Sequence, residues 1–369
     1  MHRNSRRPKC DRCLNDRFVA QRYIRIARRE RTLPPEVTLR ARWGPGCNPR
    51  YAVDWVGQKT MDIDAIAIRG LDRESVRRLS QRSDARGSLQ LAVHVSLLSA
   101  TGFLVWASRG HLWLAPALVL HGVVLSFLFC ALHESIHRTA FATRWPNELV
   151  AWICGALLML PREYFRLFHF AHHRFTQDPA RDPELAQPRP STLVSYLWCV
   201  SGLPYWYDRL AVTLRHALAG RVTEPFIPPP KSSLIVREAR ALWGCYLCVL
   251  LASLYFRRAD ALIYWVLPAI LGQPFLRLFL LSEHLGCALV DDMFANTRTT
   301  YTNAAVLLLA WRMPYHAEHH CFPSVPFHAL VKANALVGKR TQVTAPGYFA
   351  LHRKLLRQLR TGSVGVVAG

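Results

Sequence analysis

Four long apolar stretches constrain the fold of this chain more than any other feature. A helix needs about 20 apolar residues to cross the hydrocarbon core of a bilayer, and each stretch comes close to that length. Only residues 109–111 separate the first two stretches, and only residues 257–259 separate the last two. The sequence therefore predicts an all-α integral membrane protein with about four transmembrane helices in two hairpins. The predicted spans are residues 89–108, 112–132, 240–256 and 260–281.

The charge of the chain fits a membrane protein with a basic cytoplasmic face. Hydrophobic residues make up 51% of the chain, yet its formal net charge is +23. Cytoplasmic loops of membrane proteins carry an excess of Lys and Arg, so the Arg-rich segments before residue 89 and at about 209–240 place that side in the cytoplasm. The basic residues flank apolar stretches instead of forming one patch, which argues against a nucleic-acid partner.

Composition divides the chain into four segments. Residues 1–60 hold fifteen Lys or Arg against five Asp or Glu. We expect them to be a disordered extension, or to lie upstream of a true start at Met61; a basic arm on anionic lipid is the alternative. Residues 61–88 follow as a cytoplasmic amphipathic segment, residues 89–340 as the membrane domain and residues 341–369 as a C-terminal tail. Within the membrane domain, shorter apolar runs at 148–161 and 192–207 predict interfacial or re-entrant helices.

Eight of the sixteen histidines fall in three short clusters. On a helix, residues three or four positions apart share a face, so a single turn can present several imidazoles to one metal. A zinc site takes three or four protein ligands, whereas eight candidates suffice for two metals in one pocket. Ligand type alone leaves Zn, Cu, Fe and Ni open. The clusters are His133 and His137; His169, His172 and His173; and His316, His319 and His320.

These clusters follow the pattern HxxxH, HxxHH, HxxHH. Together with four spans in two hairpins, this pattern resembles the membrane fatty acid desaturases. The stretches HFAHHRFTQDP at 169–179 and PYHAEHHCFP at 314–323 look like the second and third histidine boxes of that family. The resemblance covers about residues 89–330, and it implies a cytoplasmic helical cap that carries the boxes.

The resemblance also implies a reaction. Two Fe ions would activate O₂ as co-substrate and desaturate a fatty acyl chain, since an unactivated C–H bond needs a stronger oxidant than any side chain. Electrons would come from a donor such as ferredoxin or cytochrome b5 with its reductase. His284 matches a further iron ligand of the family. Leu280 stands where some relatives have a water-linked asparagine, and Asn303 is a weak substitute.

Carboxylates near the boxes are candidates for orienting the histidines. A metal-bound histidine usually donates its second N–H to a carboxylate or a carbonyl. We expect some of the flanking acids to do this, while ordinary pairing with nearby arginines is the alternative. The candidates are Glu134, Glu163, Asp178, Asp182, Glu283 and Glu318.

We expect the remaining histidines to have structural positions instead of binding a metal. We expect His121, inside the second span, to form hydrogen bonds within the helix bundle. The others should lie in loops or at the interface; they are His111, His216, His328 and His352.

Three alternative functions remain open at the level of sequence. A hydroxylase of the same superfamily could act on an alkane, sterol or carotenoid, since Glu134 follows His133 where many desaturases have Asp. A zinc-dependent membrane hydrolase could cleave a lipid ester or amide with a metal-activated water. The clustered histidines argue against a third alternative, a membrane scaffold without activity.

Overall fold

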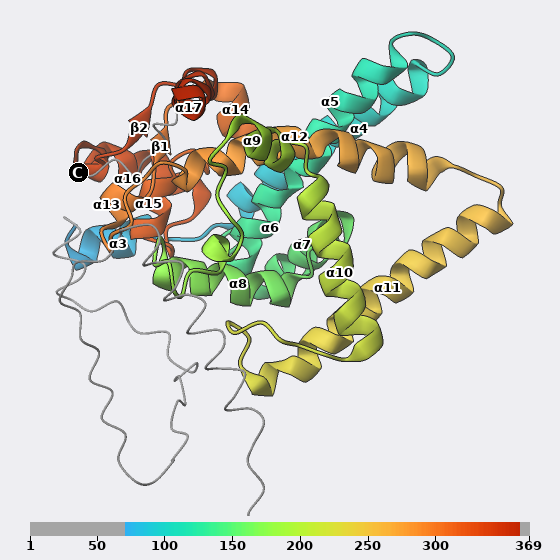
Figure 1. The fold of residues 1–369 in the computed structure, drawn as a ribbon, viewed down its shortest axis with the longest axis horizontal. Coiled ribbons are helices and arrows are strands. Elements are labelled where there is room, and N and C mark those ends of the chain that lie inside the picture. Colours follow the sequence, from blue (N-terminus) through green and yellow to red (C-terminus); the bar gives the residue numbers. More distant parts are fainter. Residues whose placement is uncertain (1–70, 362–369) are drawn as a thin grey trace, which may run out of the picture. The chain divides into compact units, whose positions relative to one another are not determined.

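The computed structural model describes residues 71–361. Outside this range lie residues 1–60, residues 61–70 of the amphipathic segment and residues 362–369 of the tail. The prediction for residues 1–60 therefore stays a prediction. The described part is almost entirely helical, and its one sheet consists of two short parallel strands, β1 (Thr299–Thr300) and β2 (Thr344–Ala345). Figure 1 shows this helical arrangement, which confirms the predicted all-α class.

Three apolar helices within residues 71–361 are long enough to cross a membrane. The first is α4 (Asp84–Ala107). The second runs over Leu114–Ile136 and comprises α5 (Leu114–Ser126) and α6 (Leu128–Ile136). The third joins a π-helical turn at Leu262–Val266 to α12 (Leu267–His284). These helices coincide with three of the four predicted spans.

The first of these helices begins earlier than predicted. The Ser83 side chain accepts a hydrogen bond from the backbone N–H of Arg86 and so caps α4 at Asp84. Such N-caps satisfy backbone donors that the first helical turn leaves unpaired. Helix α4 therefore begins five residues before the predicted span, which starts at residue 89.

The fourth predicted span, residues 240–256, corresponds to the later part of α11 (Ser232–Tyr255). This helix is not among the three that are long and apolar enough to cross a membrane. Its first half carries Arg237, Glu238 and Arg240, which lower its mean hydropathy. Its second half exposes large apolar side chains all around the helix. These are Leu247, Val249, Leu250, Leu251, Leu254 and Tyr255.

The other helices surround the ends of these long helices. Two coincide with the predicted interfacial runs, α7 (Arg144–Leu157) and α9 (Leu193–Val200). Both expose apolar stripes that include Trp152 and Trp198, as helices lying in a membrane interface do; that location stays a prediction. The remaining helices are α3 (Arg73–Leu79), α8 (Arg162–Phe175), α10 (Leu203–Ala219), α13 (Met293–Asn296), α14 (Ala304–Leu309), α15 (His316–Cys321), α16 (Leu330–Val337) and α17 (Tyr348–Thr361). Short 3₁₀ turns occupy Pro183–Ala186, Pro229–Lys231, Phe327–Ala329 and Gly338–Arg340.

The segment expected as a tail contains an amphipathic helix. In α17, Leu351, Leu355 and Leu359 recur every four residues and are buried. Side chains at this spacing share one helix face. Leu351 and Leu355 pack with Leu285, directly after α12, so residues 341–361 are part of the folded domain.

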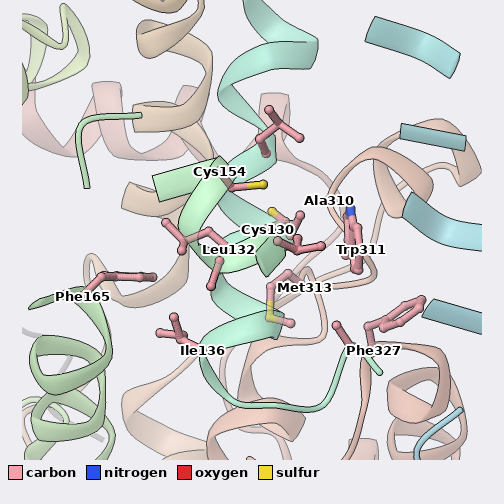
Figure 2. Packing of buried hydrophobic residues seen from close by; sticks show 14 of the residues in the cluster. Cys130, Leu132, Ile136, Cys154, Phe165, Ala310, Trp311, Met313 and Phe327 are labelled. Carbon is pink, nitrogen blue, oxygen red and sulfur yellow. The ribbon is translucent and has the colours of Figure 1, made fainter. Parts of the chain in front are cut away.

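The main apolar core surrounds α6 and thereby positions the first histidine cluster. Leu132 and Ile136 are almost completely buried. Figure 2 shows them near Phe165 from α8 and Met313 from the segment before α15. Residues of α8 and of the segment before α15, both distant in sequence, thus pack against the helix that ends at the first cluster.

The turn between α4 and α5 lies beside the turn between α11 and α12. Arg109, between α4 and α5, forms an ion pair with Asp260, between α11 and α12, at 3.6 Å. The Arg109 guanidinium also lies 5.3 Å from the centroid of the Tyr264 ring. The turns of both helix pairs therefore lie together, at the ends remote from the histidine clusters.

Candidate metal centre

Four separate elements bring the candidate ligands together. His133 lies in the last turn of α6 and His137 is the C-cap residue of that helix. The second cluster lies in the last two turns of α8, and the third forms most of α15. His284 is the last residue of α12. The candidates therefore sit where helices end, which lets residues far apart in sequence converge.

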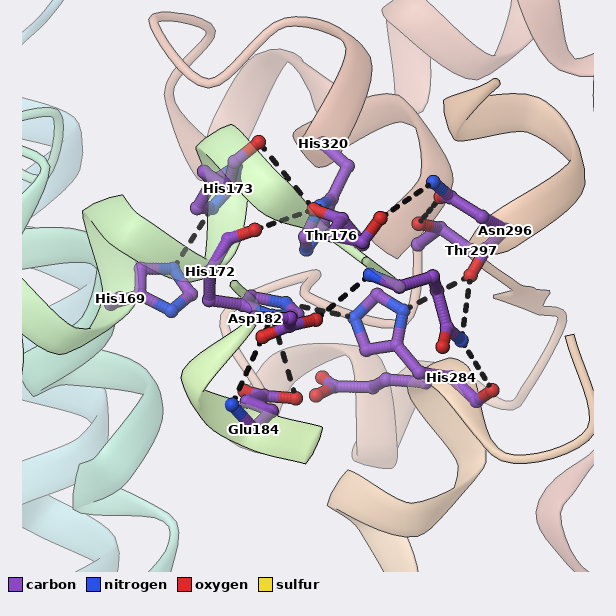
Figure 3. A network of polar contacts seen from close by, with 12 residues as sticks. His169, His172, His173, Thr176, Asp182, Glu184, His284, Asn296, Thr297 and His320 are labelled. Carbon is purple, nitrogen blue, oxygen red and sulfur yellow. Dashed lines mark hydrogen bonds and ion pairs between the residues drawn. The ribbon is translucent and has the colours of Figure 1, made fainter. Parts of the chain in front are cut away.

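The convergent histidines form two groups with the geometry of metal sites. Five belong to the first group, namely His133, His137, His169, His173 and His319. Three belong to the second, namely His172, His284 and His320. Within each group, one nitrogen from every ring lies within 4.8 Å of all the others. Figure 3 shows the second group with neighbouring polar residues.

Nitrogens of the first group approach one another at distances typical of shared metal ligands. His173 Nε2 lies 2.9 Å from His169 Nε2 and 3.1 Å from His319 Nε2. Two imidazole nitrogens that bind one metal at about 2.1 Å and about a right angle are about 3.0 Å apart. The rings thus already stand where a common ion would hold them.

The second group extends to a ninth histidine. His284 Nε2 lies 3.2 Å from His172 Nε2 and 3.1 Å from His316 Nε2. His316 is therefore adjacent to this group, although it is outside the tighter set of three. All nine residues predicted from the sequence meet in one region.

Unpaired nitrogens show that these residues fit a bound cation. A buried polar atom without a partner costs about 1–3 kcal/mol, so folded proteins rarely retain several together. Among the nine candidate ligands, seven imidazole nitrogens are buried without any hydrogen-bond partner. They are Nδ1 and Nε2 of His133, Nε2 of His137, Nδ1 of His173, Nδ1 of His316, Nδ1 of His319 and Nε2 of His320.

Burial keeps most of these imidazoles neutral. It lowers the pKa of His137 to about 3, with a further contribution from the charge of Arg166. Burial followed by repulsion from neighbouring histidines also lowers the pKa of His169, His319 and His320. A neutral imidazole keeps the lone pair that binds a metal, and this ligand suits Zn, Cu, Fe and Ni.

Comparison with known proteins identifies the family to which this centre belongs. Residues 110–350 match the sequence profile described as fatty acid desaturase. The chain belongs to the fatty acid desaturase family. Family membership makes it an oxidoreductase of lipid desaturation, as predicted, and its three apolar helices agree with a membrane protein.

Curated relatives carry the same activity in their names. A sphingolipid delta(4)-desaturase of Drosophila melanogaster is 27% identical over 69% of this chain and 76% of the relative. A sphingolipid delta(4)-desaturase/C4-monooxygenase of Rattus norvegicus is 25% identical over 60% of this chain and 65% of the relative. An sn-1 oleoyl-lipid 12-desaturase of Synechocystis is 33% identical over 38% of this chain and 40% of the relative.

In this desaturase-family chain, fixed acceptors orient all three rings of the second group. His172 Nδ1 lies 2.9 Å from Asp182 Oδ1, and His284 Nδ1 lies 3.2 Å from the carbonyl oxygen of Asn296. Thr176 Oγ1 donates to the carbonyl of His172, so it accepts from His320 Nδ1 at 3.2 Å. With each Nδ1 proton engaged, each Nε2 lone pair is available for a metal.

His172 differs from the other rings in its charge environment. Burial lowers its pKa, but Glu184 and Asp182 outweigh that effect, so the pKa of His172 is raised overall. Glu184 Oε2 lies 3.7 Å from His172 Nδ1. Asp182 was a predicted partner, whereas the sequence analysis missed Glu184, Thr176 and Asn296. Thr176 lies three residues after His173, the last histidine of the second box, and that proximity is its only sequence signal.

The other predicted carboxylates have different roles. Glu283 contacts a histidine, with Oε1 3.4 Å from His316 Nδ1. The remaining four make other contacts: Glu134 accepts from the backbone of Phe327, Glu163 pairs with Arg166, Asp178 pairs with Arg181, and Glu318 accepts from Thr299 and Asn334. Glu134 and Glu318 join separate segments of the fold, whereas Glu163 and Asp178 pair with arginines three residues away, and none of these contacts reaches a histidine.

Asn303 is not part of the centre. Its side chain accepts the backbone N–H of Val306 and caps α14. It also lines an open surface cavity of about 550 Å³ with Tyr301 and Phe349. The suggestion that Asn303 replaces the family asparagine was therefore wrong, because helix capping already uses its side chain.

The remaining histidines follow the predictions in part. His121 contacts Thr101 Oγ1 at 2.8 Å and the carbonyl of Tyr264 at 3.0 Å, which confirms its role within the helix bundle. His216 and His352 were expected in loops or at the interface but are buried in α10 and α17. They are held there by Glu224 and Tyr196, respectively.

Proposed function

We propose that this chain is a di-iron desaturase that uses O₂ to remove two hydrogens from a lipid hydrocarbon chain. The convergence of nine histidines with buried, unpaired nitrogens carries the proposal. Family membership supplies the reaction class and favours it over the zinc-dependent hydrolase.

The two histidine groups would each hold one iron. The first iron would bind His133, His137, His169, His173 and His319. The second would bind His172, His284 and His320, with His316 beside His284. Two bound irons supply the O₂-derived oxidant for the C–H bond, since the protein supplies mainly binding, orientation and electrostatics.

The protein's own residues prepare this chemistry in three ways. Asp182, Thr176 and Asn296 fix the rings of the second group. The surrounding core around Leu132 and Ile136 excludes water from the first group. Burial keeps the imidazoles neutral, so metal binding does not require proton release from most of them.

The substrate would be a lipid-linked long chain. The relatives matched over most of their length include sphingolipid delta(4)-desaturases, and an oleoyl-lipid desaturase matches over a shorter region. Hydroxylation of the same chain is the second candidate. It is favoured by the relative whose name combines desaturase with C4-monooxygenase.

An arginine-rich cavity favours an acidic protein as the electron donor. A cavity of about 290 Å³ is lined by Arg82, Arg138 and Arg144, and His137 of the first group lies in its wall. A positive surface attracts acidic partners and accelerates their association. We therefore place the docking site of an acidic carrier, such as a ferredoxin or cytochrome b5 with its reductase, at this cavity.

The proposed topology has four spans and a cytoplasmic cap. The apolar second half of α11 would provide the fourth span, paired with α12 across the turn at 257–260. Glycosylation acceptor sequences inserted at residues 109–111 and 257–260 would be modified in a eukaryotic host if both turns face the lumen. Modification of a sequence inserted near residue 221 instead would overturn the orientation.

The reaction is tested by lipid analysis. The chain is expressed with a suitable reductase, and total lipids are compared by mass spectrometry with those of the His319→Ala variant. A new double bond that the variant does not form is the expected result. A new hydroxyl group would select the second candidate. Purified, folded protein with one zinc and no iron would contradict both.

A further inference from the structure

Two consecutive residues before the third histidine cluster have a backbone conformation that favours glycine. The φ angle is 50° at Trp311 and 59° at Arg312. Bulky residues rarely adopt a positive φ, and they keep it only where surrounding contacts hold the backbone in place. His316, which begins the third cluster, follows Arg312 by only four residues. The contacts that hold this turn therefore also determine where the third cluster lies.

Two polar side chains of the apolar helix α4 make these contacts. Gln90 donates from Nε2 to the carbonyl oxygen of Leu308 at 2.7 Å, and its Oε1 accepts from Arg312 Nη1 at 3.1 Å. One helical turn later, His94 Nδ1 accepts from Trp311 Nε1 at 3.1 Å. Gln90, His94 and Trp311 are buried, so water does not compete for these hydrogen bonds. Polar residues within membrane helices are costly and are functional candidates by default.

The other nitrogen of His94 contacts the helix that leads to the first cluster. Because the indole N–H of Trp311 can only donate, His94 Nδ1 must accept and Nε2 must carry the proton. Nε2 donates to the carbonyl oxygen of Val124 at 2.9 Å. Val124 lies in the last turn of α5, three residues before Phe127, where α5 gives way to α6. One side chain of α4 therefore joins the segments that precede the first and the third clusters.

A second series of contacts joins the same turn to the first cluster. The ring centroids of Trp311 and Phe327 lie 5.1 Å apart, and Figure 2 shows both side chains. The backbone N–H of Phe327 donates to Glu134 Oε1 at 2.9 Å. Glu134 directly follows His133. The turn at Trp311 thus connects α4 with the residue next to a candidate ligand.

We propose that His94 and Gln90 are positioning residues, which fix the third histidine cluster relative to the first. Both act through the turn at Trp311 and not by contact with a metal. The two clusters supply three ligands of the first proposed iron, namely His133, His137 and His319. Metal sites depend on the groups that hold their ligands in place, so displacement of one cluster weakens the whole group. The inference rests on the proposed function, because the clusters that it aligns are the proposed iron ligands.

The same helices provide a matched control in a second buried histidine. His121 contacts Thr101 Oγ1 in α4 at 2.8 Å and the carbonyl oxygen of Tyr264 at 3.0 Å. It precedes His133 by twelve residues, which corresponds to about 18 Å along the helix axis. His121→Leu and His94→Leu each remove two buried contacts of an imidazole. Both should therefore lower the melting temperature, but only His94→Leu disturbs the turn before the third cluster.

Hydrogen exchange of the purified full chain in lipid nanodiscs measures this local effect. We expect His94→Leu to accelerate exchange of the backbone amides at residues 316–322 at least about tenfold, as for the loss of one buried hydrogen bond. Gln90→Leu should act in the same direction. His94→Gln keeps one acceptor and one donor, so it should restore part of the protection. His121→Leu should leave exchange at residues 316–322 unchanged.

Binding of Co²⁺ supplies a second measurement that a purely structural role would not change. The absorption of bound Co²⁺ should show affinity about 10- to 100-fold weaker in His94→Leu than in His121→Leu. Equal acceleration of exchange in both variants, or acceleration in neither, overturns the proposal. If the unaltered chain bound neither iron nor Co²⁺, the proposed function would fail, while hydrogen exchange would still decide the role of His94.

Discussion

At the scale of single residues, ring orientation distinguishes the two histidine groups. Each ring of the second group has a fixed acceptor at Nδ1, whereas His133 has no partner at either nitrogen. The second group is thus oriented before any metal binds. The first group depends more on packing in the core for its orientation.

Asp182 provides the sharpest test of that orientation. Asp182→Ala should lower iron affinity about 10- to 100-fold, because loss of a partner behind a metal ligand typically has this effect. Iron is measured by competition with a chelator in purified protein. The matched control is Asp178→Ala, since Asp178 pairs with Arg181 and touches no histidine. Equal affinity in both variants would show that Asp182 does not orient His172.

Residue spacing predicted the convergent histidines better than the partners of their rings. The eight clustered histidines were found because three and four residues correspond to one helical turn. Asn296 could not be found this way, because it follows His284 by twelve residues and its carbonyl meets the ring only when the chain after α12 folds back.

At the scale of helices, a close backbone contact joins α5 to α12. A Cβ added at Gly272 would lie 1.9 Å from the carbonyl oxygen of Gly122, and one added at Gly122 would lie 2.2 Å from the carbonyl oxygen of Pro268. Such distances leave no room for any side chain. Small residues at helix crossings are the usual means of close packing in membranes.

Gly272→Ala should therefore separate these helices. We expect a loss of about 1–3 kcal/mol or more, the usual cost of overpacking, together with weaker iron retention because His284 ends α12. Thermal unfolding in detergent measures the first effect. Gly244→Ala on α11 is the control, since nothing lies within 4 Å of its added Cβ. A similar melting temperature for both variants would contradict the packing argument.

A buried carboxyl couples α11 to α8. Glu238 accepts the backbone N–H of Glu163 at 3.0 Å, and burial raises the pKa of Glu238 to about 7. A folded-state pKa above the unfolded value of 4.5 means that stability is present below pH 4.5 and is lost as the pH rises through 7. Glu238→Gln should flatten the pH dependence of the melting temperature between pH 5 and 8, a range of about three units. An unchanged slope would exclude Glu238 as its source.

Helix boundaries show why the sequence predicted elements better than their ends. The apolar runs identified three helices, but capping by Ser83 moved the start of α4, and the continuation of α11 toward Ser232 depends on contacts with α10 and α8. The amphipathic spacing in α17 was visible in the sequence. Its partner near Leu285 was not, because that contact is tertiary.

At the scale of the whole molecule, exposed apolar helices and an arginine-lined cavity occur in the same protein. Many large exposed apolar side chains lie on α4, α11 and α12, whereas Arg82, Arg138 and Arg144 line the cavity beside His137. Apolar contact would fix the molecule in the bilayer, while the proposed carrier would dock at the cavity. In that arrangement one protein would bind a lipid and an electron donor simultaneously.

The carrier site makes a prediction about ionic strength. The double variant Arg82→Glu and Arg144→Glu should slow electron transfer from an acidic ferredoxin at least about tenfold at low salt, and the difference should shrink as salt is added. The absorbance of the ferredoxin reports the rate. Lys354→Glu with Arg357→Glu on α17 changes the same total charge elsewhere. If both pairs slow transfer equally, the cavity is not the docking site.

The backbone contact between Gly122 and Gly272 also sets a depth. Gly272 precedes His284 by twelve residues and Gly122 precedes His133 by eleven, so the contact lies about 17 Å from the histidines along both helices. A hydrocarbon chain running from the histidines between these helices would end where the two backbones touch. The chain length that such a path accepts would then be set by the position of the crossing along the two helices.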